Sequence, residues 1–213
     1  MPRVRQHVNP LKSDLLEIAD VPRIEASAGC AIEVELGAAE AHFLIDRALA
    51  DRETLFVGVE IRRDLIEIAN AGFIQAGVAN ARSVFANMSV DMPRLFAAGS
   101  VRRFFLNFPD PWFKSRQHKR RVIGPPLIAE VGRALAPGGE LYVMTDIFAL
   151  ALEAMAALET SELFESARGP WSFAQDNPYG AKSRRERQCE GEGARVWRLL
   201  YRRVARVVAD PSI

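Results

Sequence analysis

Short apolar runs alternate with helix-like segments along most of the chain. Runs typical of strands, rich in β-branched and aromatic residues, occupy residues 30–36, 54–60, 83–86, 101–108 and 140–145. Between them, apolar side chains recur at three-to-four spacing, which predicts helices over residues 40–50, 63–76, 90–97, 126–135 and 148–158. The segment Ala136-Pro137-Gly138-Gly139 predicts the end of the fourth helix and the turn into the fifth strand.

Strands separated by helices of this length predict βαβ units with right-handed crossovers and a parallel sheet. Further along, residues 161–165 and 196–201 can pair as a hairpin around a long polar insertion, which is typical of a substrate-facing loop. We therefore predict an α/β, doubly wound fold: a mostly parallel seven-stranded sheet with helices on both faces and the last strand antiparallel. The 213 residues fit one domain with a short amino-terminal arm that ends near residue 28.

The composition is that of an ordinary globular protein, with 49% apolar and 26% charged residues, and it excludes a mainly disordered chain. Cys30 and Cys189 are too few for a disulfide framework and lie in no metal-ligand pattern, so we expect no metal. No apolar leader begins the chain, and the most apolar stretch, residues 148–158, is too short to span a bilayer. We expect a cytoplasmic protein with no membrane partner, and the oligomeric state stays open between a monomer and a homodimer.

A polar or acidic residue lies at the end of nearly every predicted parallel strand. In an open α/β sheet, ligands bind beyond the carboxyl ends of the strands, where the strand order reverses. Any one of these residues is by itself more typical of a helix cap or a solvated loop. Five together favour a ligand site at this edge: Glu35, Glu60, Asn87, Asp110 and Asp146.

The first strand-to-helix turn narrows the class of ligand. It contains Gly37 but not the G-x-G-x-x-G pattern that cradles a pyrophosphate, which disfavours NAD. Glu60 lies where nucleotide-binding α/β proteins place an acid against ribose hydroxyls. An adenosine without a pyrophosphate, as in S-adenosyl-L-methionine, fits both observations.

A basic segment follows the fourth strand. Residues 107–121 read Asn-Phe-Pro-Asp-Pro-Trp-Phe-Lys-Ser-Arg-Gln-His-Lys-Arg-Arg and place an aspartate between two prolines ahead of a dense Lys/Arg cluster. Most such clusters are simply solvated surface. Solubility, however, requires neither the two prolines nor the tryptophan, so we interpret the segment as a polyanion-binding surface beside a carboxylate held at a strand end, which suggests chemistry on nucleic acid. The net charge of the chain is only +1, and attraction for nucleic acid must therefore come from this clustering.

This segment resembles the F-P-D-P-W-x-K-x-R-H-x-K-R-R signature of bacterial tRNA (guanine-N7-)-methyltransferases, which are class I enzymes that use S-adenosyl-L-methionine. It differs at Gln117 and His118. Residues 3–11 resemble the amino-terminal arm of the family, Gly58-Val59-Glu60 and Thr145-Asp146 resemble its strand ends, and residues 183–186 resemble its T-x-x-E segment. The resemblance covers about residues 3–201.

The resemblance implies a role for each matching residue. Asp110 would be the catalytic position. The cofactor contacts would be Glu35, Gly37, Glu60, Asn87 and Asp110. The guanosine contacts would be Lys114, Asp146, Ser183, Arg184, Arg185 and Glu186. The tRNA backbone would lie against Arg116, Lys119, Arg120 and Arg121, and the target would be guanosine 46 of the variable loop.

The first turn departs from the family, because Ala39 and Ala41 stand where glycines are usual. If either position needs a positive φ, its Cβ costs about 1 kcal/mol or more and lowers cofactor affinity. His42 is also unusual there, and we expect it to face solvent as a helix residue.

Three hypotheses follow. The chain is an active tRNA guanine-N7 methyltransferase, a paralogue that binds tRNA without turnover, or a methyltransferase for another acceptor. The first explains both the strand-end acids and the basic segment, the second is distinguished by lost cofactor binding, and the third leaves the basic segment unexplained.

Overall fold

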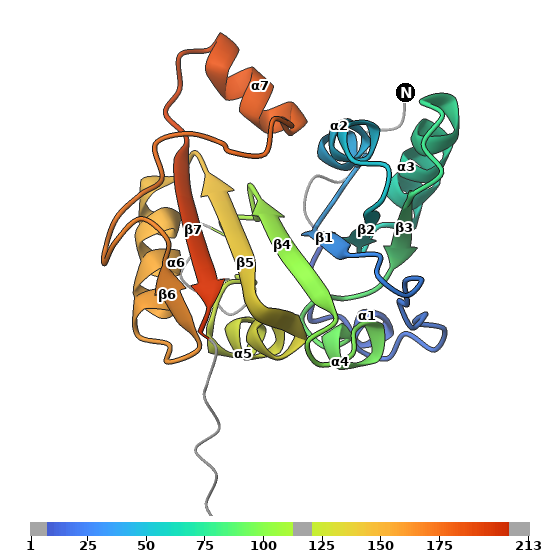
Figure 1. The fold of residues 1–213 in the computed structure, drawn as a ribbon, viewed down its shortest axis with the longest axis horizontal. Coiled ribbons are helices and arrows are strands. Elements are labelled where there is room, and N and C mark those ends of the chain that lie inside the picture. Colours follow the sequence, from blue (N-terminus) through green and yellow to red (C-terminus); the bar gives the residue numbers. More distant parts are fainter. Residues whose placement is uncertain (1–7, 113–120, 205–213) are drawn as a thin grey trace, which may run out of the picture.

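The computed structural model describes residues 8–112 and 121–204, arranged as one sheet with flanking helices (Figure 1). The strands are β1 (Ile32–Leu36), β2 (Leu55–Glu60), β3 (Ala81–Phe85), β4 (Val101–Asn107), β5 (Leu135–Thr145), β6 (Phe164–Ser166) and β7 (Trp197–Arg203). The helices are α1 (Ser13–Leu16), α2 (His42–Ala50), α3 (Arg63–Gln75), α4 (Met92–Leu95), α5 (Pro125–Ala134), α6 (Phe148–Glu159) and α7 (Arg184–Gly191).

The sheet has seven strands in the order β3-β2-β1-β4-β5-β7-β6. Neighbours from β3 to β5 pair in parallel, whereas β7 runs antiparallel to both β5 and β6. The predicted fold, including the antiparallel last strand, is confirmed. The strand order reverses between β1 and β4, and in open α/β sheets a crevice for ligands forms beyond the carboxyl ends of the strands at such a point.

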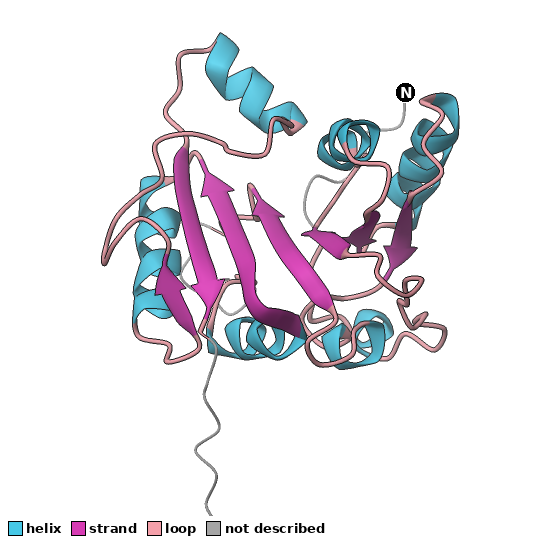
Figure 2. Ribbon diagram, viewed as in Figure 1, coloured by secondary structure: helices cyan, strands magenta, loops and turns pink. Residues whose placement is uncertain are grey.

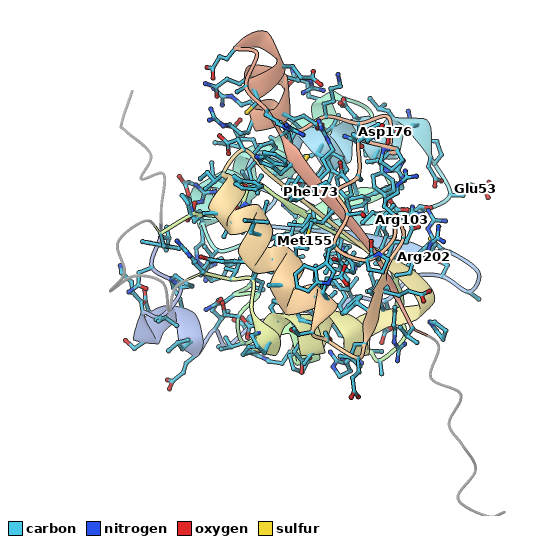
Figure 3. The ribbon with its side chains drawn as sticks, turned by 90° about the vertical axis from the view of Figure 1, so that its left-hand side faces the viewer. Glu53, Arg103, Met155, Phe173, Asp176 and Arg202 are labelled. Atoms are coloured by element: carbon cyan, nitrogen blue, oxygen red, sulfur yellow. The ribbon has the colours of Figure 1, made fainter. Side chains whose placement is uncertain are left out.

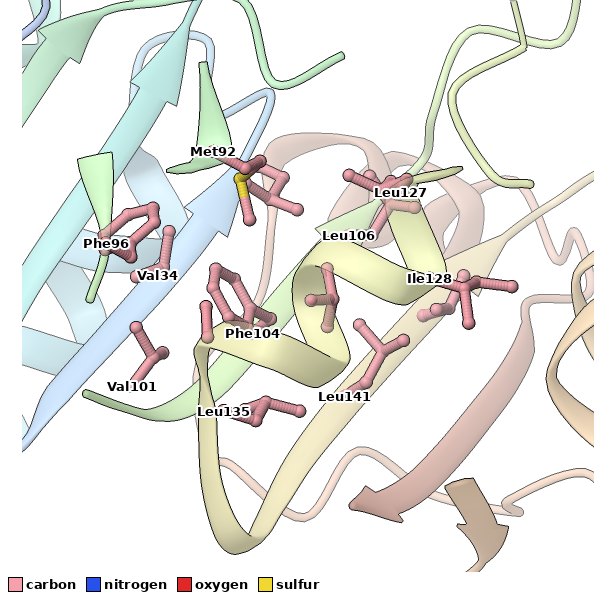
Figure 4. Packing of buried hydrophobic residues seen from close by; sticks show 14 of the residues in the cluster. Val34, Met92, Phe96, Val101, Phe104, Leu106, Leu127, Ile128, Leu135 and Leu141 are labelled. Atoms are coloured by element: carbon pink, nitrogen blue, oxygen red, sulfur yellow. The ribbon is translucent and has the colours of Figure 1, made fainter. Parts of the chain in front are cut away.

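Alternate side chains of each strand pack into different halves of the core, as a pleated strand requires. Phe104 and Leu106 of β4 lie in a cluster with Met92, Leu127 and Ile128, on the face that α4, α5 and α6 cover (Figure 4). Each apolar side chain of this size stabilises the fold by about 1.5–3 kcal/mol when fully buried.

The opposite face is covered in a different way. Over β1 to β3 it packs against α2 and α3, and Phe43 meets Phe105 of β4 edge to face at 4.7 Å. Over β4, β5 and β7, no helix of the described residues covers this face (Figure 2). Residues of the insertion between β6 and α7 pack there instead, with Ala174 and Ala181 buried. Ala174 holds the insertion to β7 by donating its backbone N–H to the Arg198 carbonyl at 2.8 Å.

Two predicted helices are shorter than their apolar patterns. The first begins at His42 because Ala41 is left-handed, with a φ of 57°. The third is a single turn, because Phe96 is extended and places its ring against Phe104, with the ring centroids 5.6 Å apart. No helix within the described ranges is long and apolar enough to cross a membrane.

Candidate active site

The described parts of the predicted site lie at the carboxyl edge of the sheet, where β1 to β5 end, and at the start of α7 (Figure 1). Helix α7 lies beyond this edge, next to α2. Residues far apart in the sequence are therefore brought to one end of the molecule.

Glu35 and Asn107 form an incompletely paired polar couple at the reversal point. The Asn107 amide donates to Glu35 Oε1 at 2.7 Å. Within the described part of the chain, Glu35 Oε2 and Asn107 Oδ1 are both buried and accept no hydrogen bond. Buried acceptors without a donor cost about 1–3 kcal/mol each. Two adjacent ones indicate a site for a ligand that carries N–H donors.

The charge state of Glu35 follows from its burial. Desolvation raises the pKa of this carboxyl from 4.5 to about 8, against the lowering effect of the Asn107 hydrogen bond and with a further rise from the charge of Glu60. Without a ligand, Glu35 is therefore mostly protonated at neutral pH. A cation bound beside it would favour the charged form and displace the proton.

Glu60, by contrast, is already saturated with donors. Its carboxylate is buried and accepts from the backbone N–H groups of Ala39, Ile61 and Arg62 at 2.9 to 3.0 Å. The Arg62 side chain adds two further bonds, from Nε at 3.0 Å and Nη2 at 3.1 Å. A ribose hydroxyl that bound Glu60 would have to replace or share the Arg62 contacts.

Arg62 also links Glu60 to the fourth strand end electrostatically. Burial lowers the pKa of its guanidinium, but the hydrogen bond and charge of Glu60 and the charge of Asp110 outweigh burial and raise it. The acids at the ends of β2 and β4 therefore lie within reach of one cation. Asp110 is half-buried.

The first turn holds its two alanines in the left-handed region, at a φ of 49° for Ala39 and 57° for Ala41. Gly37 is also left-handed, at 77°. The left-handed conformation costs an L-residue about 1–2 kcal/mol. Both alanines therefore have the positive φ at which a Cβ strains the turn. His42 begins α2, is exposed and contacts Glu40 at 3.0 Å, as expected for a helix residue that faces solvent.

Asn87 is buried, and its side chain is committed to the amino-terminal arm. Its amide donates to the carbonyls of Pro10 and Leu15 at 2.8 and 2.9 Å, while its Oδ1 accepts from Ser89. The side chain as placed therefore anchors the arm, and a cofactor contact from Asn87 stays a prediction.

The basic segment lies mostly outside the described residues, and this holds for Lys114, Arg116, Lys119 and Arg120. Arg121 is described. It donates to the Pro111 carbonyl at 2.8 Å and pairs with Glu153 of α6, and its side chain is only 14% exposed. As placed, Arg121 ties the signature to the fold, and its contact with the tRNA backbone stays a prediction.

The segment that resembles T-x-x-E forms the start of α7. Ser183 caps the helix by accepting from the Glu186 N–H at 3.1 Å. Glu186 itself is fully buried and pairs with Arg198 of β7 at 2.7 Å. Because this buried carboxylate is paired with Arg198, it holds α7 in place against β7.

The two arginines of this segment reach across the site. Arg185 pairs with Asp146, at the end of β5, at 2.5 Å, and Arg184 pairs with Glu40, in the first turn, at 3.1 Å. The structure therefore brings Asp146 together with the start of α7, as the prediction requires. Sequence reasoning missed two contributors. The sequence shows Asn107 as a polar residue at the end of a strand within the signature, whereas no sequence pattern points to Arg62.

The arrangement is a row of acids with open acceptors at its centre. It suits a ligand that carries cationic and N–H groups. Within the described ranges, no group of three His, Cys, Asp or Glu side chains is placed to hold a metal ion.

The family model and the curated relatives that match this chain are methyltransferases. Residues 30–199 match a family model described as "Putative methyltransferase". A tRNA (guanine-N(7)-)-methyltransferase of Synechococcus sp. (strain JA-3-3Ab) is 36% identical over 94% of this chain and 86% of its own. A protein of the same description from Synechococcus sp. (strain JA-2-3B'a(2-13)) is 39% identical over 88% of this chain and 79% of its own.

Solved structures show the same fold at low sequence identity. The 16S rRNA methyltransferase KamB superposes with a TM-score of 0.59 at 15% identity, covering 82% of this chain and 88% of its own. TrmN from Thermus thermophilus gives 0.58 at 12% identity, with 82% and 44% covered.

Proposed function

The chain belongs to the tRNA (guanine-N7-)-methyltransferase family, and on this premise we propose that it methylates N7 of a guanine in tRNA with S-adenosyl-L-methionine as the methyl donor. The observation that carries the proposal is the pair of open acceptors, Glu35 Oε2 and Asn107 Oδ1, at the reversal point of a methyltransferase sheet. Within the tRNA we propose guanosine 46 of the variable loop.

The residues present fit the cofactor. S-adenosyl-L-methionine carries an ammonium group, which supplies the N–H donors and positive charge that the Glu35 and Asn107 oxygens lack. When bound, it supplies an activated methyl group on a sulfonium. We propose that Glu35, Gly37, Glu60, Asn87 and Asp110 hold it, with Asn107 as a further contact. Arg62 would leave Glu60 in part as the ribose binds.

Guanine N7 carries a free lone pair at neutral pH, so no general base is needed to create the nucleophile. The work of the protein is to hold N7 in line with the methyl group and to exclude water. We propose that Asp110 or Asp146 accepts from the guanine N1–H and amino group. Such contacts select guanine and stabilise the positive charge that develops on the purine.

We propose further that Ser183, Arg184, Arg185 and Glu186 shape the guanosine pocket by different means. Ser183 and Glu186 fix the start of α7 through the helix cap and the Arg198 ion pair. Arg185 orients Asp146 through their ion pair. Lys114 would contact the guanosine and its surroundings. The tRNA backbone would lie against Arg116, Lys119, Arg120 and Arg121, which position its phosphates without reading sequence.

We also propose one methyltransferase domain for the whole chain, with residues 8–28 as an arm packed on it. Two observations support this: Asn87 binds the arm carbonyls, and Ile24 donates to the Leu95 carbonyl at 2.9 Å. The reaction would take place in the cytoplasm, by a monomer or a homodimer.

A direct test is to incubate purified protein with methyl-labelled S-adenosyl-L-methionine and tRNA that lacks N7-methylguanosine, and then to map the modified nucleoside. Label at one variable-loop guanosine is the expected result. Asp110→Ala should abolish transfer and leave tRNA affinity nearly unchanged, whereas Glu67→Gln, an exposed change on α3, should be active. Full activity of the Asp110 variant would remove that residue from catalysis.

One observation favours a second candidate, a paralogue that binds tRNA with little or no turnover. The left-handed Ala39 and Ala41 strain the turn that must meet the cofactor. Intact tRNA binding with no measurable binding of S-adenosyl-L-methionine would favour this candidate over the first.

A further inference from the structure

A cavity lies on the sheet face that the insertion covers, apart from the candidate active site. Its volume is about 410 Å³, within the range of small-ligand pockets. We call it the basic pocket, and the side chains that define it are Arg47, Arg103, Arg168, Arg202, Glu140 and Tyr179. Arg103 lies near the start of β4 and Glu140 midway along β5, whereas the candidate active site lies at the carboxyl ends of these strands. Figure 3 labels Arg103, Arg202 and Asp176, which lie on the side of the molecule that carries the basic pocket.

Positive charge is in excess around the cavity. Its lining carries four arginines and one carboxylate, Glu140. Two more carboxylates lie close by. Glu33 is fully buried and pairs with Arg47 and Arg103, and Asp176 lies 3.6 Å from Arg168. The neighbouring ion pair of Arg102 and Asp51 adds no net charge to this region. The four arginines still outnumber the three carboxylates they meet.

Glu140, the one carboxylate in the lining, is already paired with donor groups of the protein itself. Glu140 accepts from Arg103 Nε at 2.8 Å, from the Tyr179 hydroxyl at 3.2 Å and from Arg202 Nε at 3.4 Å. These contacts hold the pKa of Glu140 below its ordinary value against the opposing effect of burial. The glutamate therefore aligns the arginines, and its own repulsion of an anion is reduced.

Several guanidinium N–H groups remain for a ligand. Arg103 uses Nε and Nη1 on Glu140 and Glu33, and its Nη2 makes no hydrogen bond within the described residues. The same holds for both Nη atoms of Arg202, whose side chain is 53% exposed. The Arg168 side chain is 43% exposed, and among the described residues its one ion pair is with Asp176 at 3.6 Å. Planar forks of this kind bind phosphate oxygens in pairs.

The floor of the pocket is rigid. The Tyr179 ring packs edge to face on Phe105 at 4.9 Å, and the guanidinium carbons of Arg47 and Arg103 lie 5.7 and 5.0 Å from its centre. Cation–π contact fixes both arginines, so little side-chain freedom is lost when an anion binds.

We propose that the basic pocket binds a backbone phosphate of the tRNA, with Arg103, Arg168 and Arg202 as the donors. The assignment of this phosphate to tRNA rests on the proposed function. It is favoured by continuity of the chain, because the insertion that supplies Arg168 and Tyr179 runs directly into Ser183 and α7, the predicted guanosine contacts. The same insertion would then hold the target base at one end and a phosphate at the other. A free nucleotide offers the same chemistry, and the test distinguishes the two sources.

The test compares two double variants that remove equal charge. Arg168→Ala with Arg202→Ala alters the basic pocket, and Arg52→Ala with Arg82→Ala, both exposed and lining a different cavity, is the control. Binding of unmodified tRNA is measured over a series of KCl concentrations. We expect the pocket variant to bind about tenfold more weakly at low salt, with a salt slope about one shallower, while the control keeps the wild-type slope. Arg168→Gln with Arg202→Gln keeps the side-chain stems and serves if the alanine pair does not fold.

A second arm uses adenosine monophosphate and inorganic phosphate, with binding followed by calorimetry on the same proteins. Unchanged tRNA affinity and slope together with phosphate binding that the pocket variant loses would overturn tRNA as the source and leave a nucleotide site. Unchanged behaviour in both arms would overturn the pocket altogether. Methyl transfer at saturating tRNA is measured in parallel. Its presence in the wild type with no effect of the pocket variant on binding would refute this inference alone and leave the proposed function standing.

Discussion

The buried carboxyl of Glu35 makes the stability of the ligand-free protein depend on pH. Burial raises its pKa from 4.5 to about 8, so the folded protein binds a proton more tightly than the unfolded chain does. For a group whose pKa rises on folding, the favourable contribution is fully present below the unfolded pKa and is lost as the pH rises through the folded one. Glu35→Gln removes the ionisable group and keeps nearly the same shape.

The magnitude follows from the two pKa values. Each unit of difference is worth about 1.36 kcal/mol, so the ionisable Glu35 destabilises the fold by about 3 kcal/mol at pH 7 relative to acid conditions. About 2.5 kcal/mol of this develops between pH 5 and pH 7. Glu35→Gln should therefore be nearly neutral at pH 5 and stabilising at pH 7.

The assay is urea unfolding of wild type and variant from pH 5 to pH 8 without cofactor. Between pH 5 and pH 8 the difference in unfolding free energy should change on average by about 1.2 kcal/mol per pH unit in favour of the variant. Glu67→Gln, an exposed change on α3, should show no such trend. The variant should also bind S-adenosyl-L-methionine more weakly, since the anion beside the ammonium group is gone. A difference that stays flat with pH would refute the burial argument.

Four further substitutions test the packing that supports the site. Ala39→Gly and Ala41→Gly should each stabilise the protein by about 0.5–1 kcal/mol, because relief of the left-handed strain exceeds the entropy cost of glycine. Thermal melts would check this, with Ala38→Gly as a destabilising control. Gly58→Ala should cost about 1–3 kcal/mol, since its Cβ would lie 2.5 Å from Ser83 Oγ and 2.9 Å from Ala38 Cβ. Gly191→Ala, with open space around it, is the matched control, and equal melting temperatures for the two variants would contradict the packing. Glu186→Ala should cost about 3–5 kcal/mol in urea unfolding because it leaves Arg198 without its buried partner, and a loss below 1 kcal/mol would show that solvent reaches the pair.

Much of the fold was predictable because the relevant signals are local. Alternation along β4 places Phe104 and Phe105 on opposite faces whatever the rest of the chain does. The polar strand ends were equally visible, and the parallel topology brings Glu35, Glu60 and Asp110 to one edge as expected. The misjudged ends of helices had a tertiary cause, as when Phe96 leaves its helix to pack on Phe104.

The sequence by itself determined the α/β class, the edge of the sheet that carries the acids and the resemblance to tRNA methyltransferases. All three depend on periodicity and on residues close together in the chain. Only the tertiary structure decided which partner each polar group takes: Arg62 on Glu60, the arm carbonyls on Asn87, and an incomplete pairing for Glu35. It also decided that Ala39 and Ala41 are left-handed and that four arginines surround one cavity. Hydrogen bonds and desolvation act over a few ångströms in space, and the groups that meet at that distance are set by strand order and by the path of the insertion.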